Sequence, residues 1–75
     1  MNNVQKFLDK TENMINEFPF LYVEIARTRS TEWMAWACTH NKDTHPEREV
    51  LANGQADTAD GACAVALHKL EVLGY

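Results

Sequence analysis

The spacing of apolar residues changes twice along this 75-residue chain, and this change constrains the fold more than any other feature. Near the N-terminus, apolar side chains recur every three or four residues, which is the period of an amphipathic helix. In the middle of the chain they alternate, as on a strand with one buried face. Helical spacing returns towards the C-terminus. A chain of this length forms one domain, so we expect residues 1–75 to build a single two-layer unit.

The first helix is expected over residues 3–17. An asparagine at position 2 or 3 can cap its start, because an Asn side chain accepts hydrogen bonds from unpaired backbone N–H groups. Pro19 disfavours a helical conformation for the residue before it and therefore stops the helix. The stripe predicted to face the core consists of Val4, Phe7, Leu8, Thr11, Ile15 and Phe18.

Three strands are expected in the middle of the chain, at residues 20–28, 32–40 and 48–53. Gly54 is predicted to end the third strand, and the polar segment 41–47 is predicted to be a loop. Short connections favour antiparallel pairing of consecutive strands, so the three should form a meander.

The last helix carries the clearest signals. Asp57 is the predicted N-cap, and Asp60 lies in the first turn, where the helix dipole favours negative charge. Gly74 follows the helix, at a position that often adopts a left-handed conformation. The predicted apolar stripe is Cys63, Ala66, Leu67, Leu70 and Leu73. The fold class is therefore α+β, a three-stranded antiparallel meander with N- and C-terminal helices packed on one face.

The order α-β-β-β-α resembles that of double-stranded-RNA-binding domains over most of the chain. The nearest local likeness is the stretch 50–64, which runs from a strand through a glycine into an alanine-rich helix. In that family, lysines at the start of this helix hold RNA phosphates. Here the matching positions offer Asp57 and Asp60, and no lysine follows before Lys69. Carboxylates repel phosphates, so the resemblance implies the fold, with nucleic-acid binding kept as the alternative function.

The chain is also similar in style to small accessory proteins of bacteriophages and prophages, which usually act by binding a host protein. It is short and acidic, and Thr58-Ala59-Asp60-Gly61-Ala62 leads into its last helix. This likeness implies a non-enzymatic interaction module that binds and inhibits a host protein.

Charge and hydropathy exclude several classes of function. Eleven acidic and seven basic side chains give a net charge of −4, which disfavours nonspecific binding to nucleic acid. No apolar run approaches the ~20 residues of a membrane span. The first residues lack the basic start and apolar core of a secretory signal, so we expect a cytoplasmic protein with free thiols and no membrane contact.

Two residue types could carry site chemistry. Cys38, His40, His45 and Cys63 include the ligand types that zinc prefers, but their spacing matches no common zinc motif. The alternative is that both cysteines are small core residues. A Cys–His nucleophile pair would need an orienting third group and a pocket. We therefore expect no metal, no cofactor and no catalytic residue.

The aromatic residues of the strands point to a binding face. Trp33 and Trp36 are three residues apart on a predicted strand and so lie on opposite faces. One of them, or Met34, should lie on the face without helices, where Tyr22 can join it. An exposed aromatic patch favours a protein partner, or a homodimer in which the open faces pack together. A purely structural role for these side chains is the other interpretation. The predicted partner-binding residues are Tyr22, Arg27, Arg29 and Trp36.

Overall fold

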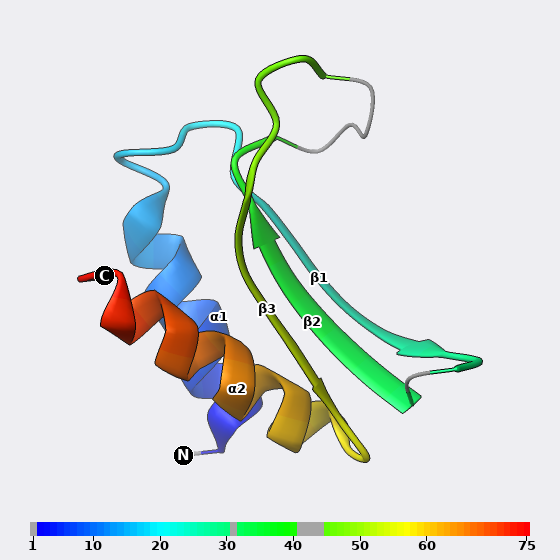
Figure 1. The fold of residues 1–75 in the computed structure, drawn as a ribbon. Helices are drawn as coiled ribbons and strands as arrows, with labels where there is room; N and C mark the ends of the chain where they lie inside the picture. Colours follow the sequence, from blue (N-terminus) through cyan, green and yellow to red (C-terminus); the bar gives the residue numbers. More distant parts are fainter. Residues whose placement is uncertain (1, 31, 41–44) are drawn as a thin grey trace.

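A computed structural model describes residues 2–30, 32–40 and 45–75 of the chain. The helices and strands in these residues are α1 (Asn3–Met14), β1 (Tyr22–Thr28), β2 (Glu32–Cys38), β3 (Val50–Ala56) and α2 (Ala59–Val72). The strands form one antiparallel sheet in the order β1-β2-β3. Both helices lie on the same face of this sheet (Figure 1). The predicted α+β fold and its α-β-β-β-α order are therefore confirmed.

Helix α2 lies unusually close to the sheet because small side chains line both surfaces. A Cβ atom added to Gly54 of β3 would lie 2.1 Å from the carbonyl oxygen of Ala62 and 2.7 Å from the backbone nitrogen of Ala66. On the sheet, Ala35 and Ala37 of β2 are completely buried. The glycine is therefore a point of close approach between strand and helix, which is one of the recognised uses of glycine inside a strand.

Helix α1 packs mainly against α2. Asn2 caps its start, as expected: the Asn2 side chain accepts a hydrogen bond from the backbone N–H of Gln5 at 2.8 Å. Phe7 is completely buried and is the largest side chain at the centre of the core. Its ring fills space that the alanines of the sheet and of α2 leave open.

The boundaries of several elements differ from the sequence-based prediction. The first helix ends at Met14 rather than at residue 17, well before Pro19. Strand β1 begins at Tyr22 rather than at residue 20, and β2 ends at Cys38 rather than at residue 40. Fraying of this kind is common, because the end of an element depends on its tertiary contacts.

The third strand was predicted to end at Gly54, and this prediction is wrong. Strand β3 continues through Gly54 to Ala56, and Gly54 pairs with Ala35 of β2. The reason is the close packing of α2, which needs a residue without a side chain in mid-strand. The strand also starts later than expected, at Val50, and its pairing with β2 contains a bulge beside Cys38.

The last helix also differs in its cap. Thr58, not Asp57, is the N-cap, and its hydroxyl accepts a hydrogen bond from the N–H of Gly61 at 3.0 Å. Asp60 lies in the first turn, as predicted. Gly74 has a φ of 97°, so its predicted left-handed conformation is confirmed.

Only some residues of the two predicted apolar stripes are buried in the structure. Leu8 and Ile15 of the first stripe are exposed, and so is Leu73 of the last. The residues of the two helices that are actually buried are Phe7, Thr11, Met14, Ala62, Cys63, Ala66 and Leu70. In the part of the chain that the structure describes, neither helix is long and apolar enough to cross a membrane.

Candidate functional site

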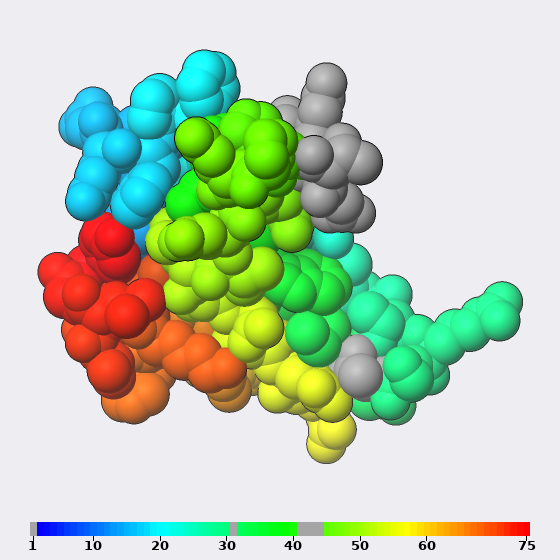
Figure 2. Space-filling view, turned by 45° about the horizontal axis from the view of Figure 1, so that its top comes forward, coloured from blue at the N-terminus to red at the C-terminus, as the bar shows by residue number. Residues whose placement is uncertain are grey.

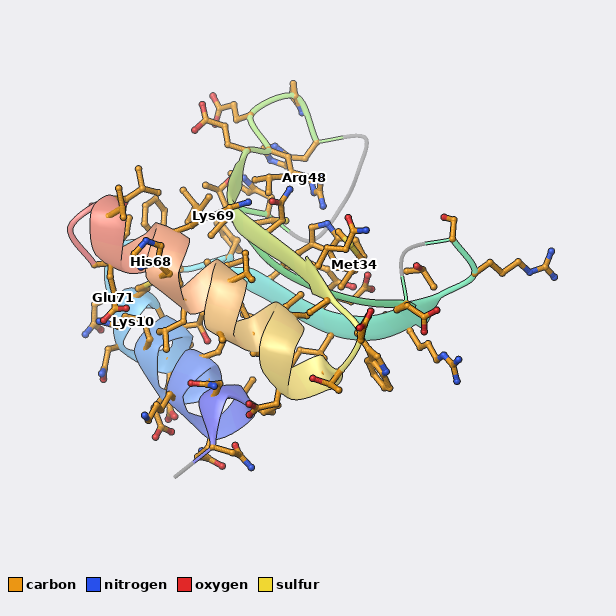
Figure 3. All side chains as sticks on the ribbon, turned by 60° about the horizontal axis from the view of Figure 1, so that its bottom comes forward. Lys10, Met34, Arg48, His68, Lys69 and Glu71 are labelled. Atoms are coloured by element: carbon orange, nitrogen blue, oxygen red, sulfur yellow. The ribbon has the colours of Figure 1, made fainter. Side chains whose placement is uncertain are left out.

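The two tryptophans of β2 lie on opposite faces of the sheet, and the structure decides which one contacts the core. Trp33 shares the helix-covered face with Ala35 and Ala37 and packs against the buried cluster. Trp36 has the opposite parity along the strand and so points to the face without helices. Met34 lies two residues from Trp36 on β2 and therefore on the same face. Figure 3 labels the Met34 side chain.

The side chains of this helix-free face come from all three strands, and we term them the open face. Strand register places Trp36 between Glu24 of β1 and Asn53 of β3. Met34 lies between Ala26 and Gln55. The open face consists of Tyr22, Glu24, Ala26, Met34, Trp36, Asn53 and Gln55. All but Gln55 are half-buried, so neighbouring side chains support them while their outer surfaces contact solvent.

Polar contacts fix two positions on the open face. The Tyr22 hydroxyl donates a hydrogen bond to Glu24 Oε2 at 2.5 Å, so the phenol lies along the strand beside the carboxylate. Lys69 of α2 donates from its ammonium to Asn53 Oδ1 at 2.9 Å, reaching over the edge of β3. Glu24 and Asn53 lie on either side of Trp36. The indole therefore lies between two polar side chains that are each held by a hydrogen bond.

One end of this sheet surface is closed by the segment before β3. Cys38 has the parity of Trp36, yet it is completely buried. Arg48 covers it, and the guanidinium nitrogen Nη2 of Arg48 donates a hydrogen bond to the Cys38 sulfur at 3.2 Å. The covered cysteine therefore marks the limit of the open face along β2.

The predicted binding residues do not all share this face. Tyr22 and Trp36 lie on it, but Arg27 pairs in register with Trp33 and so projects towards the helix side. Arg27 forms an exposed ion pair with Glu32, with an N–O distance of 3.7 Å. Arg29 lies in the β1–β2 turn, which projects from the body of the molecule (Figures 1 and 2). The structure therefore separates an aromatic face from an arginine-bearing hairpin tip.

The histidines that were considered as metal ligands come together, but in a stack. The rings of His40 and His45 lie parallel with centroids 3.8 Å apart, and Phe20 stacks on the other side of His40 with centroids 5.9 Å apart. An imidazole binds a metal in the plane of its ring. Two stacked, parallel rings cannot direct their nitrogens to one ion, and no group of three ligand-type residues forms within the described ranges.

The two cysteines are buried core residues. Both thiols are free, and both side chains are completely buried. Burial raises the pKa of the Cys63 thiol, and the nearby charge of Asp60 adds to this effect. A protonated, buried thiol is a poor nucleophile. The core interpretation of Cys38 and Cys63 therefore accounts for their positions.

Asp60 ties the two helix N-termini together, a contact that sequence reasoning missed. One carboxylate oxygen accepts a hydrogen bond from the backbone N–H of Asn3 at 2.7 Å, and the other accepts one from the Asn3 side chain at 3.0 Å. These bonds hold the pKa of Asp60 below its ordinary value. The carboxylate of Asp60 at the start of α2 is therefore negatively charged and already hydrogen-bonded to the start of α1.

The chain matches no protein-family model, no curated protein and no solved structure. What the structure shows of the predicted resemblance is the α-β-β-β-α order with three antiparallel strands.

Proposed function

We propose that this protein is a non-enzymatic interaction module and that its open face binds a protein partner. The single observation that carries the proposal is the placement of Trp36 on a sheet surface that neither α1 nor α2, the helices of the described residues, covers. Trp36 has Met34 on the same strand and shares the face with Tyr22. Tryptophan and tyrosine are enriched among the residues that dominate binding energy at protein interfaces.

The polar groups of the open face fit a protein partner better than a nucleic acid. Glu24 beside Trp36 is an acceptor with negative charge, which a phosphate backbone would meet unfavourably. Asn53 and Gln55 supply amide groups that can donate and accept hydrogen bonds with a peptide backbone. Met34 adds a flexible apolar side chain that adapts to irregular partner surfaces.

The hairpin tip extends the proposed interface. Arg27 and Arg29 are exposed there, and arginine is also enriched at interface hot spots. The tip can contact acidic groups on a partner whose apolar surface covers Trp36. A small acidic module of this kind suits an accessory protein of a phage or mobile element that inhibits a host protein by covering the host protein's functional surface.

A pull-down of the tagged chain from nuclease-treated bacterial lysate tests this proposal. Trp36→Ala is the test variant, and Phe20→Ala is the matched control, because Phe20 is a 68% exposed aromatic residue that precedes β1. We expect one partner to be retained by the wild type and by Phe20→Ala. Trp36→Ala should weaken capture by about 30-fold or more, the loss of a hot spot worth ~2 kcal/mol. Equal capture by all three chains would refute the open face as the site.

Nucleic-acid binding is the second candidate, favoured by the α-β-β-β-α topology and by the exposed hairpin arginines. Against it stands the start of α2, where Asp57 is exposed and Asp60 keeps its charge. A gel-shift titration with duplex RNA separates the two. RNA binding would weaken steeply between low and moderate salt, because phosphate contacts release counterions. We expect no shift at moderate salt.

A further inference from the structure

Two histidines lie in contact at the end of the sheet opposite the β1–β2 hairpin, between the end of β2 and the start of β3 (Figure 1). The imidazole rings of His40 and His45 are nearly parallel, with 11° between their planes and 3.8 Å between their centroids. Phe20, from the segment before β1, also stacks on His40. At a ring separation this short, a positive charge on one imidazole directly opposes a positive charge on the other.

The hydrogen bond made by the His45 ring requires a neutral imidazole. Its Nδ1 accepts a hydrogen bond from the backbone N–H of Glu47 at 3.1 Å. A ring nitrogen that accepts a hydrogen bond carries no proton, whereas both nitrogens of a histidinium are donors. The contact between His45 and Glu47 therefore exists only while the ring is neutral.

The surroundings of His40 also suit a neutral ring. Its Nδ1 lies 3.0 Å from the hydroxyl oxygen of Thr39, and that oxygen accepts a hydrogen bond from the backbone N–H of Glu49 at 2.9 Å. The hydroxyl proton can then be donated to His40, or over 3.4 Å to the carbonyl oxygen of Glu47. Two neutral rings can stack here, but two imidazolium ions would repel each other.

The turn that contains His45 also positions Arg48. The backbone N–H of Arg48 donates to the carbonyl oxygen of His45 at 3.1 Å and closes a turn with Pro46 at its second position, where proline is favoured. The Arg48 guanidinium donates to the sulfur of Cys38 and covers it. Because Cys38 has the parity of Trp36, this turn sets the limit of the open face along β2.

The charged groups closest to the pair along the chain belong to the same turn. Glu47 and Glu49 are exposed, so solvent screens their carboxylates. Arg48 carries a positive charge, which does not compensate a protonated ring. The other two residues that touch the rings, one after β2 and one before β1, are uncharged. Lys42 and Asp43 lie outside the described residues, and each variant below retains both, so comparisons between variants cancel their charges.

From this geometry, we propose that the His40–His45 pair is a pH-sensitive switch, which keeps the turn before β3 closed while both rings are neutral and opens it on protonation. An imidazole in ordinary surroundings takes up its proton near pH ~6.5. A proton on Nδ1 of His45 replaces the acceptor by a donor that faces the N–H of Glu47, and a proton on each ring adds repulsion between them. The closed turn is therefore the form above this pH, and the open turn, with Cys38 uncovered, gains population below it. Only its further effect, a longer open face for the partner at low pH, rests on the proposed function.

Amide NMR of the full chain from about pH 8 to 5 tests the switch. We expect the Glu47 amide proton to lose its hydrogen-bonded shift in parallel with the titration of the two rings. His45→Asn is the test variant, because its side-chain oxygen takes the place of Nδ1 as acceptor and does not bind a proton in this range; its Glu47 amide should stay constant. His68→Gln removes an exposed imidazole on α2 and should behave as wild type. A wild-type Glu47 amide that stays constant, or an equal response in His45→Asn, overturns the proposal.

Thiol labelling tests whether Cys38 becomes uncovered. The reagent is dithiodipyridine, which reacts with thiols in acid as well as at neutral pH, and mass spectrometry assigns the modified cysteine. Each rate is divided by the rate of the same cysteine in the urea-unfolded chain at the same pH, which cancels the ionisation of the thiol itself. We expect this relative rate for Cys38 to rise at least ~10-fold from about pH 7.5 to 5.5 in wild type and less than about twofold in His45→Asn.

Cys63 is the internal control for this labelling. It is completely buried in the core, so it should stay protected at both pH values and show that the chain has not unfolded globally. Equal protection of Cys38 at the two pH values overturns the proposal, and so does simultaneous exposure of Cys38 and Cys63. Neither experiment contains a partner, so the switch can fail while the proposed function stands, and the reverse.

Discussion

The close packing of α2 on β3 makes a strong prediction for Gly54→Ala. The new methyl carbon would lie 2.1 Å from the carbonyl oxygen of Ala62. Ordinary carbon–oxygen contacts are about 1 Å longer, so the helix must move away from the strand by roughly that amount. The obstructing atoms belong to the helix backbone and cannot rotate aside. Overpacking of this kind typically costs about 1–3 kcal/mol.

We expect Gly54→Ala to lie at the upper end of that range, because the displaced element carries much of the core. The gain from replacing a strand glycine offsets only about 0.5–1 kcal/mol. A net loss of roughly 2 kcal/mol lowers Tm by about 8–16 °C in a domain of this size. Urea unfolding followed by circular dichroism measures the free energy, and thermal melts measure Tm.

Gly74→Ala is the matched control for this experiment. It makes the same chemical change at a left-handed residue with nothing within 4 Å of the added carbon. Its cost should therefore be about 1 kcal/mol, from backbone strain alone. If the free energy of unfolding of Gly54→Ala lies within about 0.5 kcal/mol of the wild-type value, the steric argument and the close approach of α2 to β3 are refuted.

The remaining predictions concern the tryptophans, the helix tie and the buried thiol. Trp33→Ala should lower the free energy of unfolding by about 2–3 kcal/mol and Trp36→Ala by about 1 kcal/mol or less, since only Trp33 packs on the core; equal losses in urea melts would contradict this. Because the folded pKa of Asp60 is depressed, its stabilising effect is complete above the unfolded pKa, near pH ~4, and is lost as pH falls through the folded value. Wild type should therefore lose more stability than Asp60→Asn between about pH 5 and 2, and parallel pH curves would exclude the tie to Asn3. The Cys63 thiol, with its pKa raised by burial, should resist alkylation by iodoacetamide at pH 8 until the chain unfolds in urea, and rapid labelling of the native protein would show that this residue is accessible.

The spacing of apolar residues in the sequence was sufficient to predict the fold class. It predicted two helices and a three-stranded meander, because helical and extended periodicities are properties of the local chain. It also showed that Trp33 and Trp36 must face opposite ways. The left-handed conformation of Gly74 followed from its position after a helix. The prediction for Gly74 and the prediction that the two tryptophans face opposite ways were both confirmed.

The candidate site was predictable only in part. Parity along each strand placed Tyr22 opposite Val23 and placed Trp36 opposite Trp33. The strand register was needed to show that Tyr22 and Trp36 both lie on the helix-free side. Arg27 was expected near them, but it alternates with Val23 and Ile25 and lies with Trp33 on the helix-covered side, a signal that was present in the sequence. Strand register is a property of the assembled sheet, so a single-strand pattern cannot supply it.

What the sequence by itself determined was the type and order of the elements, since each depends on local spacing, caps and breakers. Only the tertiary structure decided which tryptophan meets the core, that Gly54 lies within a strand and that Asp60 binds Asn3. It also decided that Val72 and Leu73 stay exposed beside β3. These features depend on contacts between residues far apart in the chain, and the free energy of such contacts exists only once the helices and the sheet have packed together.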